Sequence, residues 1–74
     1  MKAYETYYLA NQWKQITGIS LRGFVEIMPN GDVVPDTEML ELWLKPDDDE
    51  SIEDRLRDKY GQKAVDIIEK LFDN

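Results

Sequence analysis

Carboxylates are the side chains of this sequence whose number and spacing could support chemistry. Sixteen of the 74 residues are Asp or Glu, against nine Lys or Arg, and the net charge is −7. Six carboxylates fall within eight positions, and we call them the acidic arc: Asp47, Asp48, Asp49, Glu50, Glu53 and Asp54. Carboxylates this close together can serve acid–base catalysis, coordinate a cation or dock on a basic surface.

The residue types of this chain argue against catalysis. The chain has neither His, the commonest general base, nor Cys, the strongest nucleophile. Ser20 follows a glycine by two positions, but a nucleophile elbow also needs Gly where this chain has Arg22. Gly18 and Gly23 have the spacing of a P-loop, yet the Lys and Ser or Thr of that motif are missing. We therefore predict no enzymatic activity and no catalytic residue.

The acidic arc also lacks the pattern of a calcium loop. An EF-hand that begins at Asp47 needs Gly at position 52 and Glu at position 58, where the chain has Ile52 and Asp58. The lack of cysteine excludes a Cys-based zinc site and a disulfide framework. We predict no metal site and no cofactor.

The charge lies in one half of the chain. Residues 1–35 sum to zero, whereas residues 36–74 carry six bases and thirteen acids. Such a field repels nucleic-acid phosphates and anionic membranes, so we predict neither direct nucleic-acid binding nor membrane binding. It attracts basic protein surfaces, and affinity of that origin falls as salt is added. The simpler interpretation of the arc is a solvated cap on the helix that follows it, where the helix dipole favours negative charge.

These observations predict a non-enzymatic, small acidic protein-binding module: an adaptor, regulator or inhibitor that acts through protein–protein contact. The expected partner is another protein with a basic surface, which would dock on the acidic arc. The alternative is an acidic mimic of nucleic acid, of the phage or mobile-element type, that inhibits a DNA- or RNA-binding enzyme. No apolar run is long enough for a transmembrane helix and the N-terminus does not resemble a signal peptide, so we expect a cytoplasmic location.

Aromatic side chains form the second candidate surface. In a helix over residues 3–16, an apolar stripe forms the core-facing side: Leu9, Trp13 and Ile16. Three tyrosines fall nearly opposite that stripe: Tyr4, Tyr7 and Tyr8. Either these tyrosines, together with Trp43, form a patch for a partner or for a second copy in a homodimer, or residues 3–8 are not helical.

Local signals predict the elements that position these residues. The first helix ends before Gly18, and a β-hairpin follows over residues 19–28 and 32–34, with Gly31 in its turn and Pro35 ending its second strand. Asp36 and Thr37 can cap a helix over residues 38–44, although the alternation of apolar residues there also fits a third strand.

The last third of the sequence predicts an amphipathic helical segment. Ser51 and Asp54 resemble a capping box, Gly61 interrupts the segment, and apolar residues recur at helical spacing on both sides of it. Two i, i+4 ion pairs are expected on its surface: Glu53 with Arg57, and Asp66 with Lys70. The predicted fold class is α+β: a single small domain over residues 1–74, with a hairpin or short three-stranded antiparallel sheet packed against the N-terminal helix and this segment.

Overall fold

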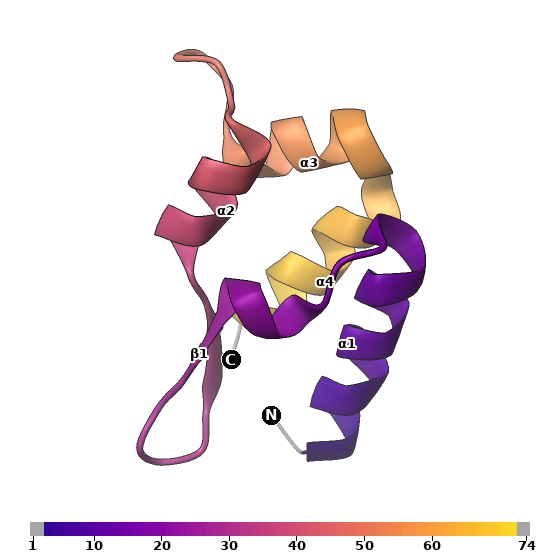
Figure 1. Ribbon diagram of the computed structural model, residues 1–74, viewed down its shortest axis with the longest axis vertical. Coiled ribbons are helices and arrows are strands. Elements are labelled where there is room, and N and C mark those ends of the chain that lie inside the picture. Colours follow the sequence, from indigo (N-terminus) through magenta and orange to yellow (C-terminus); the bar gives the residue numbers. More distant parts are fainter. Residues whose placement is uncertain (1–2, 73–74) are drawn as a thin grey trace.

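The computed structural model describes residues 3–72 and, from residue 5 onward, their side chains. The described residues form four α-helices, one 3₁₀-helix and a two-stranded antiparallel sheet, which confirms the α+β class. In chain order the elements are α1 (Ala3–Thr17), η1 (Leu21–Phe24), β1 (Val25–Ile27), β2 (Val33–Pro35), α2 (Thr37–Leu44), α3 (Ile52–Tyr60) and α4 (Gln62–Phe72). In Figure 1, α4 lies between α1 on one side and α2 with the hairpin on the other.

Helix α1 includes residues 3–8, so the non-helical alternative for the tyrosine segment is wrong. The helix ends where the sequence indicates: Gly18 adopts φ +78°, and its N–H donates to the Lys14 carbonyl at 2.8 Å. Leu9 and Trp13 are buried and Ile16 packs against the core, as the apolar stripe predicts.

The hairpin is shorter than the sequence suggests. Residues 21–24 were expected in its first strand but form the 3₁₀-helix η1, which Ser20 begins by accepting a hydrogen bond from the Arg22 N–H. The physical reason is burial: positions i and i+3 of a 3₁₀-helix share one side, and η1 thereby buries both Leu21 and Phe24. The remaining strands pair over three residues, with Ile27 opposite Val33.

Residues 37–44 form helix α2, not the alternative third strand. The Asp36 carboxylate accepts a hydrogen bond from the Met39 N–H at 3.2 Å, and Leu40 and Leu44 are completely buried. The helix ends at Lys45, which adopts a left-handed conformation with φ +51°. From α3, Arg55 reaches back and donates through Nε to the Leu44 carbonyl at 2.9 Å. This hydrogen bond ties the end of α2 to α3.

Helices α3 and α4 are separated at Gly61, as predicted. The expected i, i+4 ion pairs do not form. Arg57 instead pairs with Asp54 at 3.0 Å and donates through Nε to Gln62 at 2.7 Å, and Gln62 donates to Asp66 at 3.0 Å. Arg57 pairs with Asp54 rather than Glu53 because in this geometry its guanidinium also binds Gln62, the first residue of α4.

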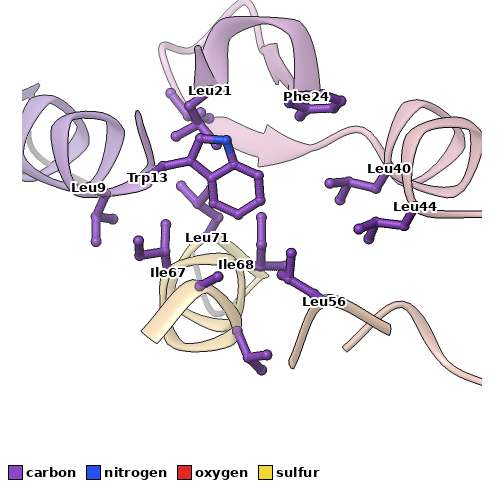
Figure 2. Close-up of a cluster of buried hydrophobic side chains, with 13 residues drawn as sticks. Leu9, Trp13, Leu21, Phe24, Leu40, Leu44, Leu56, Ile67, Ile68 and Leu71 are labelled. Atoms are coloured by element: carbon purple, nitrogen blue, oxygen red, sulfur yellow. The ribbon is translucent and has the colours of Figure 1, made fainter. Parts of the chain in front are cut away.

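One hydrophobic core joins all these elements. Trp13 projects into its centre between η1 and α4 (Figure 2). The core residues are Leu9, Trp13, Leu21, Phe24, Val33, Leu40, Leu44, Leu56, Ala64, Val65, Ile67, Ile68 and Leu71. No helix in the described part of the chain is long and apolar enough to cross a membrane.

Candidate functional site

An open groove of about 720 Å³ lies between α1 and the hairpin. Its floor is apolar, formed by the buried Leu21 and Val33 and the half-buried Ala10 and Val25. Two large side chains on its rim are largely exposed: Tyr7 at 77% and Ile27 at 76%. An apolar surface with such exposed neighbours is typical of a binding site.

Helical and strand periodicity together build the groove. On α1, residues at i, i+3, i+4 and i+7 share a face, and that face contributes Tyr7, Ala10, Asn11 and Lys14. On the hairpin, alternation directs Val25 and Ile27 to one side, where Val33 joins them because it pairs with Ile27. Thr6, Ser20, Arg22 and Gly31 complete the lining.

The groove is basic in a strongly acidic protein. Lys14 enters its lining from α1 and Arg22 from η1, and none of its lining residues is acidic. Glu26 alternates to the opposite side of β1 from Val25 and Ile27, so it does not belong to the groove. The site therefore offers apolar contact area together with two positive charges.

The acidic arc occupies the α2–α3 connection and the first turn of α3. Two of its members have structural roles: Glu50 Oε1 accepts from the Asp47 N–H at 3.1 Å, and Asp54 pairs with Arg57. Asp47, Asp48 and Asp49 are exposed, and within residues 3–72 none of them pairs with a cation. Glu53 is half-buried in the first turn of α3.

The arc and the groove lie far apart. Figure 1 shows the α2–α3 connection at one end of the long axis, and the hairpin tip at the other, with the α1 N-terminus toward that same end. The described acidic side chains include no group arranged to hold a metal ion. The structure thus separates one negative surface from one apolar, basic surface.

The predicted aromatic patch is divided. Tyr7 lines the groove, while Tyr8 is 61% exposed outside it and accepts a hydrogen bond from Gln12 at 3.0 Å. The side chain of Tyr4 is outside the described part of the structure. Trp43 is half-buried on α2 and packs against the core from the side that carries Leu40 and Leu44, and its part in a partner-binding patch stays a prediction.

Trp43 belongs to an aromatic cluster that packs against the core. Its ring stacks on Tyr60 with a centroid distance of 5.3 Å, and it lies 4.7 Å from Phe24 and 5.7 Å from Trp13. These contacts join α1, η1, α2 and α3.

Lys14, Arg22 and Ile27 are groove residues that sequence reasoning missed. A signal existed for Lys14, which stands seven positions after Tyr7 and so shares its helix face. No comparable signal exists for Arg22, because residues 21–24 were expected in a strand. No protein-family model, curated protein or solved structure matches the chain.

Proposed function

We propose that the protein is a non-enzymatic protein-binding module, an adaptor, regulator or inhibitor, and that its groove is the principal contact surface. The observation that carries this proposal is the exposure of Tyr7 and Ile27 beside the apolar floor. Removing exposed apolar surface from water is favourable by about 25 cal/mol of free energy per Å². Tyrosine is also enriched among the residues that dominate binding at protein interfaces.

The openness of the groove favours a macromolecular partner. Small-molecule sites enclose most of their ligand's surface. Here more than half of the lining residues are exposed, so a small molecule would remain largely in water. A protein segment can cover the rim as well as the floor. A cytoplasmic location is part of this proposal, since a chain without cysteine draws no stability from an oxidising compartment.

The groove proposal is tested by affinity capture with matched variants. Tyr7→Ser combined with Ile27→Ser removes both rim side chains, and Tyr8→Ser removes an exposed tyrosine that does not line the groove. We expect the double variant to lose the captured partner while its melting temperature changes little, and the Tyr8→Ser control to retain the partner. Retention of the same partner by the folded double variant would contradict the proposal.

A second candidate surface is the acidic arc, which would dock on a basic protein surface or, in the alternative function, occupy the nucleic-acid site of a DNA- or RNA-binding enzyme. The exposed Asp47, Asp48 and Asp49 favour it, because no cation in the described part of the chain neutralises them. Their field would accelerate association with a basic partner.

Salt dependence tests the arc separately from the groove. We expect Asp47→Asn, Asp48→Asn and Asp49→Asn together to weaken binding to a basic partner and to reduce its dependence on salt. A control of equal charge change replaces three exposed acids outside the arc: Glu26→Gln, Asp58→Asn and Glu69→Gln. Binding that is indifferent to salt, or equally weakened by both triple variants, would show that the arc does not recognise the partner.

A further inference from the structure

We infer that the groove takes an acidic protein segment that also carries apolar side chains, with Lys14 and Arg22 as the groups that bind its carboxylates. This inference rests on the proposed function, because it specifies the chemistry of the partner at the same groove. Two features of the groove favour such a segment: its positive charges and its apolar floor.

The two groove cations are available for a partner. Neither the Lys14 ammonium nor the Arg22 guanidinium forms an ion pair or a side-chain hydrogen bond within residues 3–72. Other arginines are engaged: Arg57 pairs with Asp54, and Arg55 donates to the Leu44 carbonyl. Among the described residues, Lys14 and Arg22 therefore have no contact that must be broken before they bind a carboxylate.

The placement of the cations beside the floor determines what kind of segment fits. Lys14 and Arg22 lie on α1 and η1, so a segment in the groove meets positive charge from two elements. Its apolar side chains would cover Ala10, Val25 and Val33, and Tyr7 and Ile27 would close over its flanks. A purely acidic segment would leave the apolar floor exposed to water. A purely apolar segment would leave Lys14 and Arg22 without partners.

A second copy of the chain is a weaker candidate for the occupant. Helix α2 does expose Leu42, at 68%, beside Glu38 and Glu41, which has the required chemistry. However, each copy carries a net charge of −7, and the repulsion between two copies opposes their association. A short acidic segment of a different protein meets the same net charge, but it brings fewer negative charges than a second copy, so the repulsion is smaller.

The test uses random dodecapeptides displayed and selected on the intact protein, followed by affinity measurements on the selected peptides. We expect these peptides to combine Asp or Glu with Leu, Ile or Phe. We expect Lys14→Gln with Arg22→Gln to weaken their binding about tenfold, which corresponds to about 1.4 kcal/mol. The matched control, Lys63→Gln with Lys70→Gln, removes two exposed charges from α4 outside the groove and is expected to leave affinity unchanged.

The outcomes separate the inference from the proposed function. Neutral or basic peptides that lose affinity with Tyr7→Ser and Ile27→Ser, but not with Lys14→Gln and Arg22→Gln, would overturn the inference and leave the groove as a binding surface. Peptides insensitive to both groove variants would overturn inference and proposed function together. Concentration-dependent self-association that Lys14→Gln and Arg22→Gln abolish would show that the occupant is a second copy and would also overturn the inference.

Discussion

The indole N–H of Trp13 is a buried polar group with no hydrogen-bond partner among the described residues. Such a group loses its hydration without compensation, at a cost of about 1–3 kcal/mol. The protein retains Trp13 because the ring fills the centre of the core, where it contacts Phe24 and Trp43 at centroid distances of 6.2 and 5.7 Å. The position thus combines favourable packing with an unsatisfied donor.

This conflict predicts an asymmetric response to substitution at Trp13. Trp13→Leu removes the aromatic contacts and is expected to lower the free energy of unfolding by about 3 kcal/mol. Trp13→Phe keeps a ring and removes the unsatisfied N–H, so its cost should be about 1 kcal/mol because the two effects partly offset each other. Equilibrium unfolding in urea measures both values. A cost for Trp13→Phe as large as that for Trp13→Leu would mean that the N–H has a partner in solution.

At the scale of elements, α2 ends on an unfavourable backbone conformation. Lys45 is the only described residue other than glycine with positive φ, and its N–H donates to the Glu41 carbonyl at 2.8 Å. A left-handed conformation costs an L-residue about 1–2 kcal/mol, and glycine is the usual residue at this position of a helix end. The junction is held in place by the Arg55 hydrogen bond to Leu44.

Lys45→Gly is therefore expected to stabilise the protein by about 0.5–1 kcal/mol, after the greater backbone entropy of glycine in the unfolded chain is subtracted. Lys45→Ala is the matched control, because it removes the same charge and keeps the unfavourable φ. Urea unfolding should show a gain for the glycine variant alone. Loss of stability in Lys45→Gly, or an equal gain in Lys45→Ala, would contradict this explanation.

Elements whose signals are local could be predicted from the sequence. Asp36 and Ser51 cap their helices because each side chain accepts a hydrogen bond from the backbone N–H three residues later. Gly31 supplies the positive φ of the hairpin turn. Prediction failed where contacts between residues distant in the sequence determine the local structure. Residues 21–24 form a 3₁₀-helix because this conformation places both Leu21 and Phe24 in the core. Trp43 packs inward because Phe24 and Tyr60 lie against its ring.

The groove could not be predicted because its lining comes from four separate elements, α1, η1, β1 and β2. Only tertiary packing brings Lys14 of α1, Arg22 of η1 and Ile27 of β1 to one surface. The acidic arc was visible in the sequence because its six residues lie within eight consecutive positions. A docking role for the arc stays a prediction. Glu50 has a structural role in the α2–α3 connection, where it accepts a hydrogen bond from the Asp47 N–H, and Asp54 has one in the first turn of α3, where it pairs with Arg57.

At the scale of the whole molecule, the protein presents two chemically opposed surfaces at a distance from each other. The α2–α3 connection, which lies at one end of the long axis in Figure 1, carries most of the acidic arc. The groove between α1 and the hairpin is apolar and basic. A scaffold with this arrangement can contact an acidic, apolar segment and a basic surface without competition between the two sites. We propose that recognition of the principal partner occurs at the groove.

Backbone amide NMR spectra of the labelled protein, recorded while the partner captured by the wild-type chain is added, test where the partner binds. Recognition at the groove predicts chemical-shift changes concentrated at Ala10, Lys14, Val25 and Ile27, which line the groove. Shift changes confined to residues 47–54, with the groove amides unmoved, would contradict it.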